Sequence, residues 1–544
     1  MPFPSVGPER LYVSPSADER ARPSRFVQPL VCRKRRRIGV DGRVLTGERY
    51  TESLPPAPRH AFSVHADLPE LGRPRVALAM ESVLAAIGLT PEARELLPVG
   101  RALRVAVIDA DFGGWSALGE AVDRATLELV PLGERLQFPR AAERPAPVQR
   151  AVGHGVAMAG VVRAMAPGAR LGLFEVPLTQ SSYVYPTDLA AAIARAVGAW
   201  NADVVLVALA HGYWGMPAHL RAVLRGAARH GRGGRGAAVV CCSGRLDQNR
   251  DVHGDSAALA GDDFTSQPEV IPVSACALDG RWYRFHQYPL SRLGPAIELC
   301  APGDLVSVPG AGTADDSSLA AALVAGTAAL ALEANPRLGL AELRHVLRAT
   351  ADAGEVDGAP PGTGLEAGRL NEWDRTGHNF KIGYGRVHVL RACLAAADPI
   401  ALALLSARHA PGADPAAEAM AASWERHLRA LPAARRYLEV RGRLVAAAIG
   451  DLDLRDALLW LARHALALRR EGAPAWRDDG MDHGVLADRL QHALELLRSS
   501  AAGRRSPAIR RWAGGLLTAL GGAPAGDVAG FAAAALDFPS GPEA

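Results

Sequence analysis

The 544-residue chain is poor in lysine and in cysteine, and these shortages bear on what kind of protein it is. Only two of its 61 basic residues are lysines, Lys34 and Lys381, an arginine bias that we attribute to a GC-rich, bacterial-type genome. The six cysteines show no CxxC or CxxH spacing, and three of them lie in apolar runs typical of buried strands. We therefore expect a reduced, cytoplasmic protein with no metal, no cofactor and no disulfide framework.

The sequence also lacks long apolar runs and a strong charge imbalance. Its longest uncharged apolar-leaning run, Leu319 to Leu332, has fourteen residues, fewer than the ~18–20 that a membrane-spanning helix needs. The first twenty residues contain no apolar segment of the kind found in secretory signal peptides, so we expect neither secretion nor a membrane partner. The net charge of +4 is spread unevenly, because residues 1–60 hold twelve basic and six acidic residues. The remainder is close to neutral, which argues against a nucleic acid partner.

The composition divides the chain into four regions. Residues 1–60 are rich in Pro, Ser and Arg and are predicted to form an extended basic tail. Its CRKRRR segment (32–37) suits nucleic acid binding or processing, but a solvated basic loop is the favoured interpretation. Residues 61–102 have helical spacing and are predicted to form a helical extension, followed by a main domain over 103–398 and a C-terminal domain over 399–544.

The main domain alternates short apolar strands with helical segments. Such strands, apolar along their whole length, are typical of an α/β fold with a doubly wound parallel sheet that is covered on both faces. The expected strands cover residues 104–109, 171–176, 203–209, 237–242, 270–276 and 296–302. In such sheets reactive groups gather where strands end and the next helices begin.

The strand pattern stops after about Asp398. Residues 450–471, 485–499 and 507–522 have the apolar spacing of helices, and Asp451 or Asp453 is a plausible N-cap for the first of them. We therefore expect the C-terminal domain to be an all-α appendage that adds no catalytic group.

Three polar residues occupy strand-end or helix-start positions in the main domain. Asp109 ends an apolar strand, His154 begins a helix of small residues, and Ser318 precedes a long apolar helix. Each has a structural alternative as a turn former, a helix-start residue or an N-cap. Together, an acid, an imidazole and a hydroxyl are the parts of a nucleophilic relay.

In that chain order the segments RVAVIDADFGG, HGVAMAGVVRAMAPGARL and SSLAAALVAGTAALALEANP resemble the catalytic segments of the subtilase family of serine proteases. The resemblance covers about residues 100–398 and implies a subtilisin-like fold. It implies that Asp109 orients the histidine, that His154 is the general base and that Ser318 is the nucleophile. The segment DVVLVALAHG resembles the strand that pairs with substrate backbone, which implies substrate contacts at Ala208, Leu209 and Ala210.

Three departures from the family pattern affect this interpretation. Asp316-Ser317 replaces the Gly-Thr that precedes the nucleophile, and Ala322 replaces a proline. The oxyanion-hole asparagine is replaced by Arg245, with Asn249 four residues later. Either Asn249 or Arg245 donates to the oxyanion, or this donor is missing. The neutral amide of Asn249 is slightly favoured because it reproduces the family's chemistry.

The sequence therefore predicts a regulated subtilisin-like serine endopeptidase that acts on a protein or peptide through an Asp-His-Ser triad. A partner protein is expected to bind through the helical C-terminal domain. Two alternatives stay open: a catalytically weakened fold that serves as a binding or scaffold module, and an enzyme that transfers the acyl group to an amine.

Overall fold

The protein is described by a computed structural model in which the chain divides into two compact units. The first comprises residues 1–90, 98–333 and 351–388, and the second comprises 91–97, 334–350 and 389–544. The structure describes residues 77–110, 112–123, 126, 153–176, 186–209, 216–244, 264–282, 284–285, 288–289, 291, 293–353, 373–406, 415–430, 435–451 and 453–455, the backbone of 36–38 and 44–46, and scattered residues between 488 and 514.

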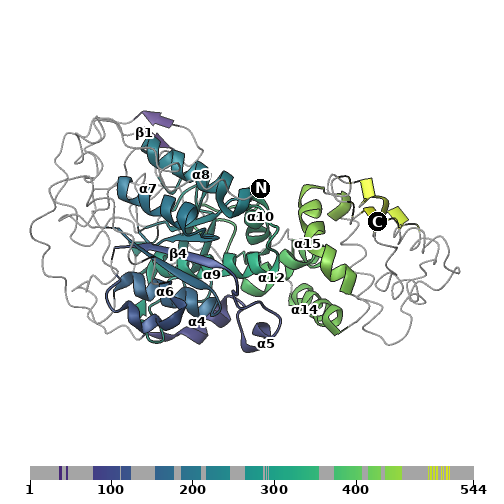
Figure 1. Cartoon of the computed structure of the whole chain (residues 1–544), viewed down its shortest axis with the longest axis horizontal. Coiled ribbons are helices and arrows are strands. Elements are labelled where there is room, and N and C mark those ends of the chain that lie inside the picture. Colours follow the sequence, from purple (N-terminus) through teal and green to yellow (C-terminus); the bar gives the residue numbers. More distant parts are fainter. Residues whose placement is uncertain are drawn as a thin grey trace, which may run out of the picture. The chain divides into compact units, whose positions relative to one another are not determined.

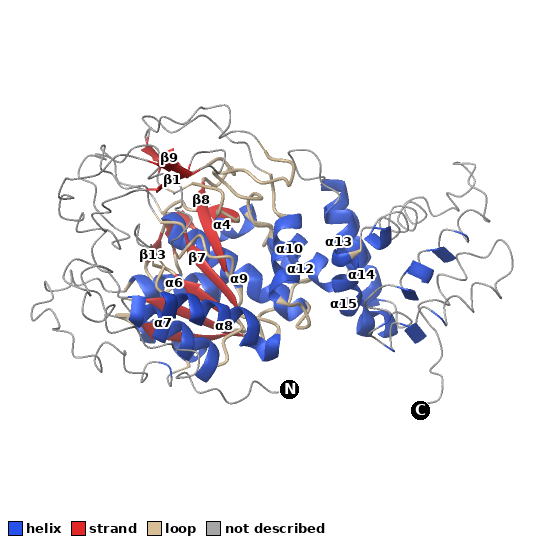
Figure 2. Ribbon diagram, turned by 90° about the horizontal axis from the view of Figure 1, so that it is seen from above, coloured by secondary structure: helices blue, strands red, loops and turns tan. Residues whose placement is uncertain are grey.

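A six-stranded parallel sheet forms the centre of the first unit (Figure 1 and Figure 2). In spatial order it runs β5-β4-β6-β7-β8-β11. The strands are β4 (Arg104–Asp109), β5 (Arg170–Glu175), β6 (Val204–Val207), β7 (Ala238–Cys242), β8 (Val270–Cys276) and β11 (Leu299–Pro302). Each lies within or one residue from a predicted strand, because unbroken apolar runs are buried on both faces of such a sheet. The predicted α/β parallel-sheet class is confirmed.

Helices cover both faces of this sheet (Figure 1). One face packs against α7 (Pro186–Ala194), which continues into a π-helical turn η5 (Arg195–Ala199), and against α8 (Ala218–Gly234). The opposite face packs against α6 (His154–Met165) and α9 (Asp316–Ala334). Among the described helices α9 alone has the length and composition of a membrane span, but 83% of its apolar window is buried inside the protein.

The order of the strands creates a switch point beside β4. After β4 the chain adds β5 on one side of that strand and then β6 on the other. Parallel α/β sheets bind ligands beyond the carboxyl ends of the strands at such a point. Here those ends are Asp109 on β4 and Val207 on β6.

The rest of the first unit and the predicted helical extension contain smaller elements. The predicted helical extension contains, over its described residues, the strand β3 (Leu78–Ala79) and the short helices α4 (Met80–Ala86) and α5 (Pro91–Arg94). β3 pairs with β12 (Val306–Ser307), which pairs with β13 (Thr313–Ala314). The remaining elements are η2 (Trp115–Ala121) and the antiparallel pair β9 (Arg284–Phe285) and β10 (Tyr288–Pro289). Residues 1–60 were predicted to form an extended tail without regular structure. Their described residues instead form two short strands, β1 (Arg36–Ile38) and β2 (Val44–Thr46), which pair antiparallel.

The described residues of the second unit form helices and turns without a strand. The helices are α10 (Leu340–Thr350), α12 (Val389–Ala397), α13 (Pro399–Ser406), α14 (Pro415–Ala430) and α15 (Arg435–Gly450), together with α5. The predicted helices over 450–471, 485–499 and 507–522 lie mostly outside the described residues.

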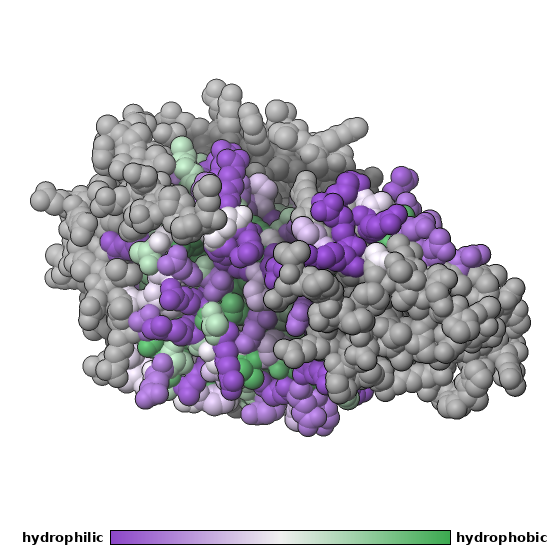
Figure 3. Space-filling view, turned by 45° about the vertical axis from the view of Figure 1, so that its right-hand side comes forward, coloured by the Kyte–Doolittle hydropathy of each residue, from purple (hydrophilic) through white to green (hydrophobic). Residues whose placement is uncertain are grey.

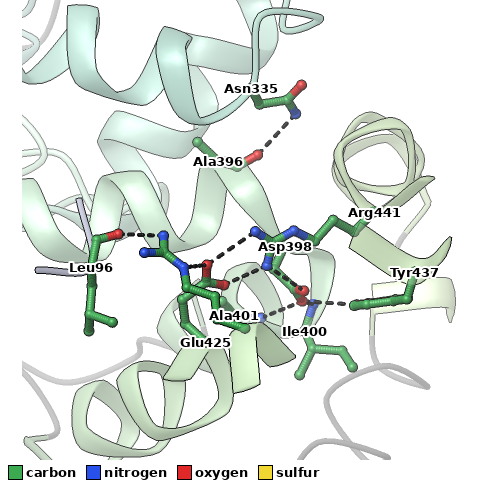
Figure 4. Close-up of polar contacts among 10 residues, drawn as sticks. Leu96, Asn335, Ala396, Asp398, Ile400, Ala401, Glu425, Tyr437 and Arg441 are labelled. Atoms are coloured by element: carbon green, nitrogen blue, oxygen red, sulfur yellow. Dashed lines mark hydrogen bonds and ion pairs between the residues drawn. The ribbon is translucent and has the colours of Figure 1, made fainter. Parts of the chain in front are cut away.

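The second unit starts earlier than the sequence predicts, at Val389 rather than at residue 399, and it draws in two distant segments. Hydrogen bonds explain this difference (Figure 4). Asn335 donates through its side-chain amide to the carbonyls of Ala396, at 2.9 Å, and Gly442, at 2.8 Å. Arg429 donates to the carbonyl of Leu96 at 2.7 Å. These contacts join residues far apart in the chain, which no local sequence pattern reveals.

The described surface is predominantly polar on the face shown in Figure 3, where hydrophobic residues are scattered among hydrophilic ones. Among the described large apolar side chains, only Val99 is well exposed. Among the residues that the structure describes, no cluster of exposed large apolar side chains competes with the sheet edge as a candidate site.

Candidate active site

The end of β4 and the start of α6 bring an acid and an imidazole into contact. Asp109, the last residue of β4, is 2% exposed, and His154 is the first residue of α6. The amide of Gly153 donates to the carbonyl of Gly113 at 2.7 Å, which ties the start of α6 to the segment that follows β4. His154 Nδ1 and Asp109 Oδ2 are 2.6 Å apart. The sheet and the helix thus fix the relative positions of the two side chains.

This contact determines which ring nitrogen of His154 can act as a base. A carboxylate oxygen accepts hydrogen bonds, so Nδ1 carries the proton and donates it to Asp109. The amide of Ala110 donates to the other carboxylate oxygen at 2.6 Å, which holds the carboxylate in place. His154 Nε2 is buried and has no hydrogen-bond partner among the described residues. In the neutral ring this nitrogen is an acceptor that faces no competing donor.

Ser318 lies in the first turn of α9 and is half-buried. Its hydroxyl donates to the carbonyl of Ala208, just beyond β6, across a long distance of 3.4 Å. In this structure no hydrogen bond joins the described side chains of Ser318 and His154. The weak bond to Ala208 leaves the hydroxyl easy to redirect.

The first turn of α9 leaves one backbone amide available. Asp316 N–H donates to the carbonyl of Gly303 at 2.8 Å, and Leu319 N–H donates to the carbonyl of Asp315 at 3.2 Å. Ser317 N–H donates to Asp316 Oδ1 at 2.6 Å. Within the described part of the chain, the amide of Ser318 has no acceptor. A free amide at a helix N-terminus is a suitable donor to a developing oxyanion.

Asp316 departs from ordinary backbone geometry. Its φ of +65° lies in the left-handed region, which glycine adopts without steric cost and which other residues rarely enter. The sequence comparison aligned this position with a glycine of the subtilase pattern, so the structure keeps the glycine-type backbone with an aspartate in place. The Asp316 carboxylate is 6% exposed.

Sequence reasoning missed one residue of this region, Cys242 at the end of β7. Burial raises the pKa of its thiol to about 12. A hydrogen bond with Ser318 opposes that shift, whereas the charges of Asp316 and Asp109 reinforce it. These interactions place Cys242 next to the candidate nucleophile. The pair Cys241-Cys242 at the end of a predicted strand was the available signal, but cysteines in apolar runs are ordinarily small core residues.

The predicted substrate-strand residues are partly described. Ala208 and Leu209 follow β6 and are 3% and 2% exposed, and the amide of Ala208 donates to the carbonyl of Ile108 at 3.2 Å. Ala210 and both candidate oxyanion donors, Arg245 and Asn249, lie outside the described residues. The described residues contain no group of three or more His, Cys, Asp or Glu side chains that could hold a metal ion.

Comparison with known proteins relates this arrangement to a family. The model of the subtilase family, Peptidase_S8, matches residues 138–385. No curated protein matches the chain. The match spans the predicted base and nucleophile, and Asp109 lies before its start.

Several solved structures are similar in fold. One is a lanthipeptide protease, with 18% identity, a TM-score of 0.39, and coverage of 58% of this chain and 94% of that one. A second is the MycP3 protease from the type VII (ESX-3) secretion system, with 20% identity, a TM-score of 0.39, and coverage of 59% and 90%. A third is fervidolysin from Fervidobacterium pennivorans, with 20% identity, a TM-score of 0.38, and coverage of 57% and 45%.

Proposed function

Because residues 138–385 place this chain in the subtilase family of serine proteases, we propose that it is a serine endopeptidase that cleaves a protein or peptide through Asp109, His154 and Ser318. The observation that carries the proposal is the 2.6 Å contact between Asp109 and His154 at the switch point of the sheet. It leaves His154 Nε2 as a buried acceptor without a partner among the described residues, and such a nitrogen can take the proton of a serine.

In the proposed reaction, Ser318 Oγ attacks the carbonyl carbon of the scissile bond while His154 Nε2 takes its proton. Asp109 keeps the proton on Nδ1 and stabilises the imidazolium that forms. The same imidazolium then protonates the leaving amine, and water releases the acyl group by the reverse sequence. The free amide of Ser318 supports stabilisation of the oxyanion in both steps.

A second donor to the oxyanion is expected from the segment after Gly244, where Asn249 and Arg245 are the candidates. Loss of one true donor costs ~10²–10³ in kcat, a figure measured in a subtilase. Asn249→Ala and Arg245→Ala are therefore expected to differ, with only one of them slowing turnover. If neither change slows a turnover that depends on Ser318, both assignments are wrong.

Two observations favour a second candidate function, a binding or scaffold module built on a catalytically weakened fold. The hydroxyl of Ser318 is directed to Ala208 rather than to His154, and Asp316 adds a buried carboxylate next to a site that must stabilise negative charge. Both features are compatible with catalysis, because active-site hydrogen bonds often form only when substrate is bound.

Labelling with a fluorophosphonate probe distinguishes these functions without knowledge of the substrate. The probe phosphonylates an activated serine, so wild type is expected to be labelled at Ser318, as mapped by mass spectrometry of the modified peptide. Ser318→Ala and His154→Ala are expected to abolish that labelling while leaving the fold intact. Equal lack of labelling in folded wild type and in Ser318→Ala would favour the scaffold function.

A regulated activity also forms part of the proposal. The second unit would recruit a partner protein or control access to the site, since its described helices contain none of the three proposed catalytic residues. The cytoplasmic location inferred from the sequence stays a prediction, which immunodetection in separated cell fractions checks.

A further inference from the structure

Three buried serine side chains form a hydrogen-bonded cluster at the carboxyl ends of β7 and β8. Ser243 directly follows β7, Ser274 belongs to β8, and Ser291 lies two residues after β10. All three residues are completely buried. None of the three serines takes part in the proposed reaction, so we consider what else their hydrogen-bonded arrangement contributes.

Counting donors and acceptors fixes the direction of each bond in this cluster. Ser291 Oγ accepts the amide proton of Ala275 at 2.9 Å and the hydroxyl proton of Ser274 at 3.1 Å. A hydroxyl has two acceptor lone pairs and one proton, so both acceptor positions of Ser291 are occupied. Its own proton must therefore be donated to Ser243 Oγ, 2.9 Å away. Ser243 in turn donates weakly to the carbonyl of Gly244 at 3.4 Å.

The chain of bonds ends beside the candidate nucleophile. Ser243 directly follows Cys242, whose thiol interacts with Ser318. Gly244 has a φ of +83°, a conformation that turns the chain away from the sheet. The end of β7 is thus held from two sides, by the Ser243 amide bonded to the carbonyl of Val273 at 2.9 Å and by the Ser291 hydroxyl.

We propose that Ser291 is a positioning residue for the reaction, which holds the end of β7 in place next to Ser318. This inference rests on the proposed peptidase function. In a buried environment, hydrogen-bonded side chains that satisfy one another are stiff, and loss of the central member leaves several polar groups unpaired. Removal of the Ser291 hydroxyl detaches Ser243 and leaves the Ala275 amide without an acceptor, and the Ser274 hydroxyl keeps only a long contact of 3.5 Å with the carbonyl of Ala275.

Ser274 offers a matched control. Its hydroxyl is equally buried and donates to the same oxygen, but it does not contact Ser243. Ser274→Ala therefore removes one hydroxyl from the same cluster and keeps the bond from Ser291 to Ser243. Ser291→Ala and Ser274→Ala remove the same chemical group and differ in whether β7 stays attached.

The test compares the two variants in the full chain with two measurements. The first is hydrogen–deuterium exchange of the peptide that covers residues 238–244, and the second is the rate of fluorophosphonate labelling at Ser318. Ser291→Ala is expected to exchange faster and to be labelled at least about tenfold more slowly, because small displacements near reacting atoms are costly. Ser274→Ala is expected to stay close to wild type in both. Ser243→Ala should reproduce Ser291→Ala, and the double variant should be no slower than either single variant.

The outcomes separate this inference from the proposed function. If wild type is labelled and Ser291→Ala matches Ser274→Ala in either measurement, Ser291 is not a positioning residue. If folded wild type is not labelled at all, the peptidase proposal fails, and the positioning role of Ser291 fails with it. Should Ser291→Ala not fold, the pair Ser243→Ala and Ser274→Ala decides the question by the same two measurements.

Discussion

Asp316 combines two features that work against the site it adjoins. A residue other than glycine at a left-handed φ costs about 1–3 kcal/mol. Its buried carboxylate also places negative charge close to where the oxyanion would form. Asp316 Oδ1 also accepts a hydrogen bond from the amide of Ser317, which partly offsets these costs. Because the negative charge remains near the oxyanion, we expect Asp316 to lower the rate at which Ser318 reacts.

Two substitutions at Asp316 separate strain from charge. Asp316→Asn keeps the acceptor and tolerates the left-handed conformation, so it is expected to speed labelling of Ser318 with little change in thermal stability. Asp316→Gly relieves the strain, which is worth about 1–3 kcal/mol, but it removes the acceptor of the Ser317 amide, which costs about 0.5–1.5 kcal/mol. It is therefore expected to raise the free energy of unfolding by about 1 kcal/mol relative to Asp316→Asn. Melting temperatures and labelling rates of both variants check this. A lower melting temperature for Asp316→Gly than for Asp316→Asn would contradict the strain argument.

Cys242 is the other nucleophilic side chain next to Ser318, and its protonation state decides whether it competes. The thiolate is the reactive form, and a pKa of about 12 keeps the thiol neutral at pH 7–8. Treatment of wild type with iodoacetamide at pH 7.5 is therefore expected to leave the labelling rate of Ser318 unchanged. Cys242→Ala serves as the comparison. A loss of labelling in wild type that accompanies an adduct mapped to Cys242 would contradict the assignment.

The helices that carry His154 and Ser318 approach each other closely because of a glycine. A β-carbon built at Gly326 of α9 would lie 2.5 Å from the β-carbon of Met165 in α6. That distance is too short for any pair of β-carbons, so only glycine permits the observed spacing. The absence of a side chain at Gly326 therefore sets the distance between the helix that carries His154 and the helix that carries Ser318.

Gly326→Ala is therefore expected to destabilise the protein although alanine favours helices. The forced separation of α6 and α9 costs about 1–3 kcal/mol, against a gain in helix propensity of up to about 1 kcal/mol. Labelling of Ser318 is expected to slow as well, because the helices carry the base and the nucleophile. Gly450→Ala, at the end of α15 where a β-carbon meets open space, is the control and should leave melting temperature and labelling unchanged. Equal behaviour of the two variants would show that the close approach is unimportant.

Elements with a strong local pattern could be predicted from the sequence. β8 matches its prediction residue for residue, and β4 does as well, because a short run dominated by β-branched and other apolar residues indicates a buried parallel strand. The two-residue strands β3, β12 and β13 were not predicted, because two residues carry no recognisable pattern and because β3 pairs with β12 across more than 200 residues. The sequence identified Asp109 and His154 as candidates, but it could show neither their contact, which joins residues 45 apart in the chain, nor the left-handed backbone of Asp316.

The second unit is held together by charged groups inside it as well as by apolar packing. Asp398 and Glu425 are both buried carboxylates, and both face Arg441 (Figure 4). Glu425 also accepts from Arg429 at 2.8 Å, whereas Asp398 accepts from the Tyr437 hydroxyl at 3.0 Å and from the amide of Ile400. Two cations therefore contact Glu425 directly, and Asp398 has a single cation at 3.6 Å.

This difference gives the two carboxyl groups opposite pKa shifts. Burial raises the pKa of Asp398, and the charge of Arg441 only partly offsets it. For Glu425 burial acts in the same direction, but hydrogen bonds and charge from Arg441 and Arg429 outweigh it and lower the pKa. Glu425 thus contributes stability above its ordinary pKa and loses it as the pH falls through the lowered folded value. Asp398 does the reverse, because its ionisation in the folded state becomes a penalty as the pH rises past its ordinary pKa.

Neutralising each group should consequently have opposite effects on the free energy of unfolding of the helical unit at pH 7. Glu425→Gln is expected to lower it by about 3–5 kcal/mol, because the largely buried guanidinium group of Arg441 loses the anion that it contacts directly. Asp398→Asn keeps the acceptor for Ile400 and Tyr437 and removes the penalty, so it should leave stability unchanged or raise it. Calorimetry of the full chain from pH 7 to pH 3 measures both. The deficit of Glu425→Gln should shrink only as the pH falls below the ordinary glutamate pKa of 4.5, because the unfolded carboxyl then binds a proton while the lowered pKa keeps the folded carboxylate ionised. Equal destabilisation by the two variants would mean that Arg441 pairs with both carboxylates alike and that the assigned pKa directions are wrong.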